Sequence, residues 1–312
     1  MTEVPRTASA LVVDLYELTM MQAYHLEGVD GRATFDLFVR RLPEGRDFLL
    51  VAGLATVLDQ LEAIQFTATD LEYLATLGEF RDDFLGRLEG LRFTGDVVAM
   101  PEGTVAFAGE PILRVTAPII EAQLLETVVM NLIHLQTLIA SKAARVVLAA
   151  KGRGLVDFGL RRTHGTESGL YGARASHIAG FAATSNVAAG ERFGIPVTGT
   201  MAHSYVQALG DEAAAFRSFA EAYPETVLLV DTYDTLRGVD RVIALAEELG
   251  TDFTVRAIRL DSGDLTALAA EARRRLDAAG LEGVQIFASG NLDEVGVQEL
   301  VRKGAPIDGF GI

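Results

Sequence analysis

The second half of the chain alternates short apolar runs with longer segments of helical periodicity. Apolar runs of strand length stand at Leu155–Phe158, Pro196–Thr200, Val227–Asp231, Thr254–Leu260, Val284–Ala288 and Ile307–Gly311. Helical periodicity fills the stretches between them, at Ala173–Ala189, Asp211–Ala222, Val239–Leu249, Asp264–Ala279 and Leu292–Arg302. Because a helix connects each predicted strand to the next, the pattern predicts βαβ units and a parallel sheet.

The first part of the chain has a mixed pattern. Ala33–Val39 predicts a strand, and a helix is predicted to bury one apolar face made of Leu54, Val57, Leu58, Leu61 and Ile64. A helix-rich piece follows from about Thr69. Over residues 91–116, short apolar runs separated by Pro and Gly predict a small β-rich unit, and a long helical stretch then reaches from Pro118 to about Ala150.

These patterns predict an α/β protein with two domains. Residues 1–118 form an N-terminal α/β domain with its β-rich unit, and residues 119–312 form an irregular parallel α/β barrel. Six predicted strands are too few for a complete eight-stranded barrel. Either the barrel borrows from the first domain, or the second domain is truncated at its C-terminal end, which the ending Gly309-Phe310-Gly311-Ile312 favours.

Composition narrows the class of protein. A chain of 312 residues that is 49% apolar can bury a large core. Its 43 acidic and 27 basic residues give a net charge of −16, which argues against a nucleic-acid or anionic-membrane surface. The chain has no cysteine, which removes disulfides and a thiol nucleophile and fits a cytoplasmic location. The N-terminus predicts no signal peptide, and the apolar stretch Thr127–Ser141 predicts a buried helix, with His134 in the core.

Polar side chains follow the predicted strands where these strands end. The richest cluster is Arg259-Leu260-Asp261-Ser262-Gly263-Asp264. Similar clusters stand at Asp157–Arg161, Asp231–Asp234 and Ala288–Asn291. Because ligands of parallel α/β sheets collect at the carboxyl ends of the strands, we expect these clusters to share one site.

The charged residues of these clusters differ in what they predict. Arginine suits carboxylate and phosphate, and Arg161 and Arg259 are the better candidates, whereas Arg162 and Arg174 are more typical of surface residues. Asp264 stands equally well as the N-cap of the next helix. Asp261 is the better candidate for ribose hydroxyls or Mg²⁺, with Asp264 second.

Other residues at strand ends add further candidates. His203 follows a predicted strand, with a structural and a catalytic role equally open. Phe158 could stack on a flat ligand ring, although simple packing explains it too. The turn glycines could present N–H groups to a phosphate, although βα turns need glycine in any case; they are Gly290, Gly309 and Gly311.

Several motifs in order along the whole chain resemble the nicotinate phosphoribosyltransferase family. They are Asp14-Leu15-Tyr16-Glu17-Leu18-Thr19-Met20, Asp157-Phe158-Gly159-Leu160-Arg161-Arg162, Gly199-Thr200-Met201-Ala202-His203-Ser204, Arg259-Leu260-Asp261-Ser262-Gly263-Asp264 and Gly309-Phe310-Gly311-Ile312. The resemblance implies a type II phosphoribosyltransferase fold and a homodimer with shared active sites. It implies that nicotinate and 5-phosphoribosyl 1-pyrophosphate (PRPP) yield nicotinate mononucleotide and pyrophosphate, coupled to ATP hydrolysis, in NAD salvage.

The resemblance also implies roles for individual residues. His203 matches the histidine that ATP phosphorylates transiently, Asp261 matches the carboxylate beside the ribose, and Mg²⁺ is expected to bind through the pyrophosphate. Phe158 and the partner subunit's Tyr16 match the rings on the two faces of the pyridine. Further matches are expected to bind substrate or its phosphates: Arg161, Ser185, Arg259, Ser262, Gly290, Gly309 and Gly311. Val13, where many relatives have Thr, is a minor departure.

Other functions stay open at this point. Nicotinamide phosphoribosyltransferase shares these motifs, but Thr184-Ser185-Asn186 offers no acid near the pyridine substituent, which favours nicotinate. Quinolinate phosphoribosyltransferase would not need the His203 motif. A catalytically silent protein that binds PRPP or a nucleotide is a further alternative. A barrel aldolase is disfavoured because the three lysines, at 142, 151 and 303, do not stand at predicted strand ends.

Overall fold

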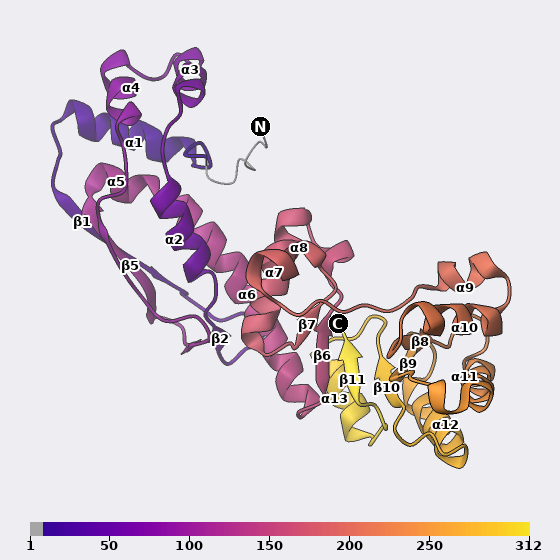
Figure 1. Ribbon diagram of the computed structural model, residues 1–312. Coiled ribbons are helices and arrows are strands. Elements are labelled where there is room, and N and C mark those ends of the chain that lie inside the picture. The colour runs from indigo at the N-terminus through magenta and orange to yellow at the C-terminus, as the bar shows by residue number, and fades with distance from the viewer. Residues whose placement is uncertain (1–8) are drawn as a thin grey trace. The chain divides into compact units, whose positions relative to one another are not determined.

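The computed structural model describes residues 9–312, which divide into two compact units (Figure 1). One unit ends at Ser141 and the other is Lys142–Ile312, so the division falls within the long helix α6 (Glu126–Ala150). The boundary expected from the sequence, 118/119, instead coincides with the end of strand β5 (Pro111–Pro118).

The first unit is built around an antiparallel sheet. Its strand order is β1 (Arg32–Phe38), β5, β3 (Asp96–Ala99), and a separate pair joins β2 (Leu49–Leu50) to β4 (Val105–Ala106). Arg114 and Asp36 stand opposite each other on β5 and β1 and form an ion pair of 2.7 Å. The other helices of this unit are α1 (Leu15–Leu26), α2 (Leu54–Ala63), α3 (Ala68–Thr76), α4 (Asp82–Glu89) and α5 (Ile119–Leu124).

Two side chains in this unit lie elsewhere than the pattern predicted. Leu58 was expected on the buried face of α2, but it is 40% exposed, because Val57 and Leu61 fill that face and Leu58 lies one step around the helix. His134 was expected in the core, yet it lies on the exposed side of α6.

Helix α6 is long and apolar enough, by length and composition alone, to cross a membrane, a test that core helices also pass. Its buried polar side chains are used within the first unit. The Thr137 hydroxyl donates to the Ala52 carbonyl at 3.0 Å, and the Ser141 hydroxyl accepts from the Leu50 N–H at 2.9 Å. The helix expected to be buried is therefore buried along one face only. That face carries both polar and apolar side chains.

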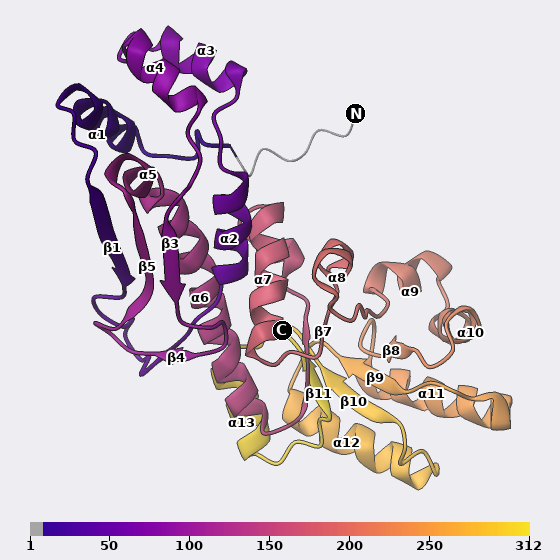
Figure 2. The same ribbon diagram turned by 60° about the vertical axis from the view of Figure 1, so that its left-hand side comes forward.

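The second unit is a parallel sheet that curls into a half-barrel (Figure 2). Its strand order is β7 (Ala183–Thr184), β6 (Gly154–Asp157), β11 (Gly309–Gly311), β10 (Gln285–Ala288), β9 (Ala257–Leu260), β8 (Val227–Leu229). The connecting helices are η2 (Leu160–Arg162), α7 (Thr166–Ala179), α8 (Val187–Phe193), α9 (His203–Leu209), α10 (Glu212–Ala222), α11 (Thr235–Leu249), η3 (Gly250–Asp252), α12 (Leu265–Ala278) and α13 (Glu294–Arg302). The predicted α/β barrel class is thereby confirmed.

Alternation along the strands separates an apolar face from a polar one. Ile258 of β9 and Ile286 of β10 are in register and fully buried in the main core with side chains of α11, α12 and α13. The next residues along, Arg259 and Phe287, are also in register and point to the opposite face, because strand side chains alternate. This alternation places the side chain of Arg259 on the inside of the half-barrel.

Two predicted elements of the second unit are wrong. Pro196–Thr200 is not a strand: only Val197 forms a bridge, to Thr184, because β7 offers two residues for pairing. The helix predicted over Ala173–Ala189 is interrupted at Gly180, whose φ of 116° ends α7. The chain then forms β7, which takes the place of the predicted strand as the sixth of the sheet.

Candidate active site

A cavity of about 180 Å³ opens at the carboxyl ends of the parallel strands, within the second unit. The residues that follow β6, β9, β10 and β11 line it, among them Phe158, Arg161, Arg162, Arg259, Asp261, Ser289, Gly290, Asn291 and Gly311. The sequence clusters after these strands therefore share one site, as expected.

Arg259 lies at the centre of the polar network in this site. It is 9% exposed, and its guanidinium donates to Asp261 Oδ1, Ser289 Oγ and the Met201 carbonyl, each at 2.9 Å. The Ser289 hydroxyl donates in turn to Asp261 Oδ1 at 2.5 Å. Burial lowers the pKa of Arg259, and the charges of Asp261 and Asp231 oppose this shift. Arginine stays protonated in proteins, so the site holds a fixed positive charge.

Asp231 supports the same network from the end of β8. Its Oδ2 accepts from the Asp261 N–H at 3.0 Å and from the Ser262 hydroxyl at 2.5 Å. Its Oδ1 is buried and has no hydrogen-bond partner among residues 9–312. The sequence placed Asp231 at a strand end but did not identify it as a site residue. Its position could have indicated the role, because Asp231 stands two residues after β8 and Asp261 stands one residue after β9.

His203 begins α9 and points toward the same acid. Its Nδ1 lies 3.2 Å from Thr232 Oγ1, and its Nε2 lies 3.9 Å from Asp261 Oδ2. With Nδ1 engaged by the hydroxyl, Nε2 is the nitrogen that faces the site. The imidazole side chain is 41% exposed, so a ligand can reach it.

Three glycines allow close approaches that a side chain would block. A Cβ at Gly311 would stand 2.4 Å from the ring of Phe158, and one at Gly309 would stand 2.3 Å from the ring of Phe287. Gly290 has φ of 91°, and its Cβ would stand 2.0 Å from the Asp261 carbonyl oxygen. Packing therefore requires these glycines, and their binding of phosphate stays a prediction.

The arginines near the site have different surroundings. Arg161 is exposed and, within the described part of the chain, its guanidinium has no hydrogen-bond or ion-pair partner. Its charge contributes to the lowered pKa of Arg259. Arg162, expected as a surface residue, is exposed, and it donates to Asn291 Oδ1 at 2.6 Å. Arg174 stacks over the ring of Phe193 and does not line the cavity.

The acids and hydroxyl near β7 have structural partners. Both carboxylate oxygens of Asp157 accept hydrogen bonds, from the Gly159 N–H at 2.9 Å and from the Thr184 hydroxyl at 2.7 Å. The Ser185 N–H donates to the Asp157 carbonyl, and Ser185 is not among the residues that line the cavity. Asp264 is the N-cap of α12, where its Oδ1 accepts from the N–H groups of Thr266 and Ala267.

Within residues 9–312, no group of three or more acidic or histidine side chains is arranged to hold a metal ion. Asp264 Oδ1 already accepts the hydrogen bonds that cap α12. Asp261 is therefore the better of the two predicted carboxylates for binding a metal ion. A divalent cation here would therefore need oxygen atoms of a bound substrate as further ligands.

Tyr16 belongs to the first unit, where it lies on α1 and is 45% exposed. Partial burial and a hydrogen bond with Glu126 raise the pKa of Tyr16 to about 12, so its hydroxyl stays protonated at neutral pH. The structure leaves its predicted contact with a substrate ring untested.

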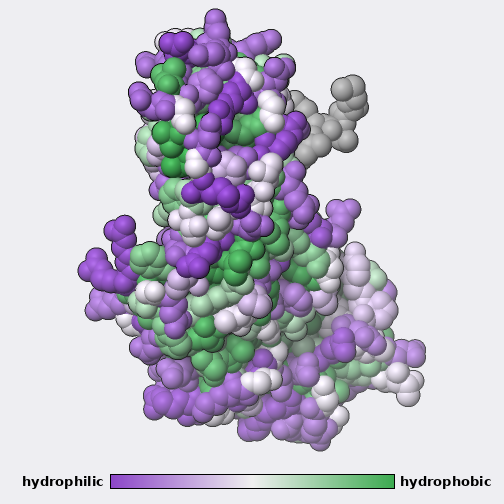
Figure 3. Space-filling view, turned by 90° about the vertical axis from the view of Figure 1, so that its left-hand side faces the viewer, coloured by the Kyte–Doolittle hydropathy of each residue, from purple (hydrophilic) through white to green (hydrophobic). Residues whose placement is uncertain are grey.

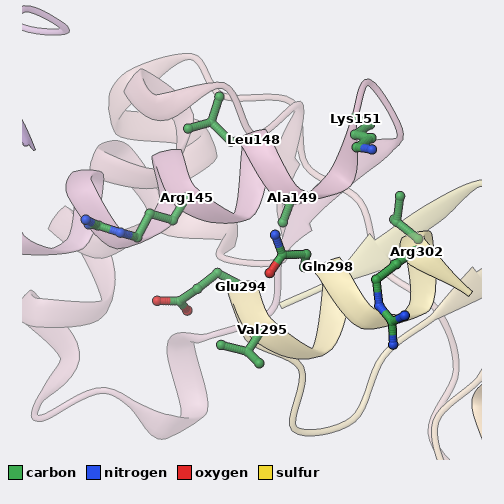
Figure 4. Close-up of a pocket in the computed structure, with 9 residues that line it drawn as sticks. Arg145, Leu148, Ala149, Lys151, Glu294, Val295, Gln298 and Arg302 are labelled. Carbon is green, nitrogen blue, oxygen red and sulfur yellow. The ribbon is translucent and has the colours of Figure 1, made fainter. Parts of the chain in front are cut away.

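A larger hollow, about 670 Å³, lies between α6 and α13 (Figure 4). Exposed Leu148 and Val295 form its walls, and its acid, Glu294, is already paired with Lys142 at 2.6 Å. It lies in the helical layer and lacks the polar network that surrounds Arg259. Size alone therefore does not identify the active site.

Comparison with known proteins gives the family. The model of the nicotinate phosphoribosyltransferase N-terminal domain matches residues 11–134, and that of the nicotinate phosphoribosyltransferase family matches residues 154–303. A human nicotinate phosphoribosyltransferase is 33% identical over 371 residues, which cover 99% of this chain and 69% of the human protein. The chain belongs to the nicotinate phosphoribosyltransferase family.

Bacterial relatives in this family are more similar. A nicotinate phosphoribosyltransferase of Mycobacterium tuberculosis is 59% identical over 303 residues, and one of Bacillus subtilis is 46% identical over 305. Each match covers 97% of this chain, which spans 65% and 62% of the two relatives' lengths. The predicted family membership is confirmed.

Two solved structures share the fold. The crystal structure of human nicotinic acid phosphoribosyltransferase gives a TM-score of 0.88 at 34% identity, covering 96% of this chain and 72% of the human chain. A nicotinate-nucleotide pyrophosphorylase from Pyrococcus furiosus gives 0.81 at 25% identity, covering 100% of this chain and 72% of that chain. The half-barrel is therefore of the type II phosphoribosyltransferase kind.

Proposed function

We propose that the protein is a nicotinate phosphoribosyltransferase that converts nicotinate and PRPP into nicotinate mononucleotide and pyrophosphate. This reaction is the entry of salvaged nicotinate into NAD synthesis, and we place it in the cytoplasm. The observation that carries the proposal is the Arg259–Asp261–Ser289 network, which lies beside the ring of Phe158 at the carboxyl ends of the strands. Both substrates are anionic, and one is a flat ring, so this combination of cations and an aromatic side chain suits them.

In the reaction, the pyridine nitrogen forms a bond to the anomeric carbon of the ribose, and the bond from that carbon to pyrophosphate breaks. Positive charge develops at the anomeric carbon in the transition state. Asp261 has its Oδ1 fixed by Ser289 and Arg259, so its carboxylate is held ready to stabilise this charge. Arg161, which has no partner in the described chain, can bind the nicotinate carboxylate or a phosphate.

We further propose that ATP phosphorylates His203. The γ-phosphoryl group would move from ATP to imidazole Nε2, with ADP as the leaving group, and water would later accept it as inorganic phosphate. Because Nε2 lies 3.9 Å from Asp261 Oδ2, the phosphate would stand beside a carboxylate and would need a counter-charge. Mg²⁺, held by pyrophosphate oxygens and by Asp261, is the cation that we propose for that charge.

Nicotinate is favoured over nicotinamide by the surroundings of β7. Asp157, the acid that accepts hydrogen bonds from Gly159 and Thr184, is buried and does not line the cavity, so it does not face a carboxamide bound there. Ser185 and Asn186 carry no negative charge that would repel a carboxylate. Nicotinamide phosphoribosyltransferase and a silent PRPP-binding protein are the alternatives.

The test is to incubate the protein with PRPP and Mg²⁺, to offer nicotinate or nicotinamide in parallel, and to measure mononucleotide formation with and without ATP. We expect nicotinate mononucleotide, with ATP stimulation that His203→Asn abolishes. Nicotinamide mononucleotide would favour the rival enzyme, and PRPP binding without product would favour the silent protein. Full ATP stimulation in His203→Asn would contradict the role of His203.

We also propose a homodimer in which Tyr16 reaches the partner's active site. Large apolar side chains are exposed beside Tyr16 on α1, at Leu15 (55%) and Met20 (36%), which suits a protein interface. In Figure 3, apolar residues gather in patches between polar ones on the face turned to the viewer. Mixing Tyr16→Ala, which should be inactive, with His203→Asn, which should lack ATP stimulation, should restore ATP-stimulated activity at about a quarter of the sites if dimers exchange subunits at random. Monomers by sedimentation, or no recovery after subunit exchange, would contradict this arrangement.

A further inference from the structure

The turn after β10 carries two consecutive residues with left-handed backbone, Gly290 (φ 91°) and Asn291 (φ 52°). Asparagine adopts this region more readily than other side-chain-bearing residues, but glycine adopts it more readily still. At position 290 a Cβ would clash with the Asp261 carbonyl oxygen, so glycine is required there. Asn291 adopts a positive φ although it carries a side chain, so the contacts of that side chain matter.

The only side-chain hydrogen bond of Asn291 in the described chain is with Arg162. The Arg162 guanidinium donates to Asn291 Oδ1 at 2.6 Å, across 129 positions of sequence. Arg162 lies in η2 after β6, whereas Asn291 follows β10, and β11 stands between these two strands in the sheet. The bond therefore ties together two loops at the mouth of the cavity, and both residues line it.

The turn that this bond holds presents free donors. Within residues 9–312, neither the Gly290 N–H nor the Asn291 N–H donates a hydrogen bond. Successive N–H groups in such a turn form a concave site that favours anions. An anion that binds here needs the turn to keep its shape before the ligand arrives, because ordering a loop during binding weakens affinity.

We propose that Arg162 is a positioning residue, which holds Asn291 and thereby preorganises the turn at Gly290 and Asn291 for the phosphate groups of PRPP. We call the Arg162–Asn291 hydrogen bond the loop latch. The proposal rests on the proposed function for the identity of the anion. It assigns Arg162 an effect through Asn291, rather than a direct contact with the ligand.

A double-mutant cycle tests the loop latch. PRPP affinity is measured by titration calorimetry for the wild type, Arg162→Gln, Asn291→Gly and the double variant. We expect Arg162→Gln to weaken PRPP binding about tenfold, as the loss of a charged hydrogen bond predicts. In the Asn291→Gly background, the same substitution should have almost no further effect. Equal losses in both backgrounds would show direct ligand contact and overturn the proposal, as would unchanged affinity in Arg162→Gln.

Kinetics and controls separate positioning from a general loss of structure. We expect Arg162→Gln to raise KM for PRPP and to leave KM for nicotinate unchanged, and Arg162→Lys to recover part of the loss. A rise of both KM values together would contradict the proposal. Arg302→Gln, which changes an exposed arginine of α13, is the matched control and should bind PRPP as the wild type does. If the wild type binds PRPP but makes no nicotinate mononucleotide, the proposed function fails while the cycle still tests the latch. If the wild type does not bind PRPP, the latch proposal is overturned too.

Discussion

Two polar clusters, one in each unit of the protein, balance charge differently. In the second unit, Arg259 lies among Asp231, Asp261 and Ser289. In the first unit, Thr127 lies between two acids: its hydroxyl is 2.5 Å from both Asp14 Oδ2 and Glu17 Oε1. A cation offsets the acids of the Arg259 cluster, whereas the contacts of the Thr127 cluster include only a hydroxyl and an N–H as donors.

This difference decides where protons reside. A hydroxyl has one proton, so Thr127 cannot donate to Asp14 and Glu17 at once, and the two short contacts are satisfied together only if one carboxyl is protonated. Glu17 is fully buried, and its Oε2 has no partner among the described residues. Burial raises the pKa of Glu17 accordingly. In the first unit, where no cation lies in the Thr127 cluster, the buried acid Glu17 keeps its proton more readily.

Replacing the central cation should have the largest effect. Arg259→Lys keeps a positive charge. A single ammonium group, however, cannot replace the planar guanidinium that donates to Asp261, Ser289 and the Met201 carbonyl at once. We expect kcat/KM to fall about a hundredfold or more, since each charged hydrogen bond contributes about 1.5–3 kcal/mol. Steady-state kinetics measures this. Arg256→Lys, on the same segment but with a side chain that is 68% exposed, is the control and should behave as wild type. A loss of less than about threefold would contradict the central role of Arg259.

Removing the proton-binding acid of the first unit should change the pH dependence of stability. The raised pKa of Glu17 means that its stabilising contribution is complete below the unfolded value of 4.5 and is lost as pH rises through the folded value. Glu17→Gln removes that loss, so the free energy of unfolding should fall less steeply with pH above 4.5 than in the wild type. Urea unfolding at a series of pH values measures this slope.

A surface acid provides a control of opposite sign. Hydrogen bonds from Arg274 and Arg275 lower the pKa of Glu271 to about 2, so its contribution is present above 4.5 and is lost as pH falls toward 2. Glu271→Gln should therefore lower stability above pH 4.5, and it should remove the part of the pH dependence that falls in the acidic range. If Glu17→Gln followed the wild-type slope above pH 4.5, the buried acid would not be holding its proton more tightly in the folded state.

The smallest effect is expected at Asp264, which lies next to the Arg259 cluster but serves its helix. Asp264→Ala should destabilise the protein by about 1 kcal/mol, as loss of an N-cap does, with kcat/KM unchanged. Asp293→Ala, which removes the N-cap of α13, is the matched control. Thermal unfolding and steady-state kinetics on the same samples distinguish an N-cap role from a catalytic role of Asp264. A large fall in kcat/KM in Asp264→Ala, but not in Asp293→Ala, would show a catalytic role.

The sequence predicted the location of the site better than its contacts. Apolar runs placed Asp261 and Ser289 at the ends of strands, because burial on both faces makes parallel strands read as apolar runs. It could not predict β7, whose two residues are too few for any period. The bond from Arg162 to Asn291 joins residues 129 positions apart, and no local pattern carries that information. The prediction that His134 lies in the core was wrong for a related reason. Apolar neighbours in the sequence do not indicate which side of a helix packs against the rest of the protein.

The place of β11 in the sheet has a consequence for synthesis of the protein. β11 lies between β6 and β10, yet it follows both in the chain. As the chain emerges from the ribosome, β6 and β10 each present an unpaired edge until residues 309–311 are released and fill the gap. Exposed strand edges invite pairing with other chains. Pauses in translation just before this strand would therefore lengthen the period in which the nascent protein is most prone to aggregate.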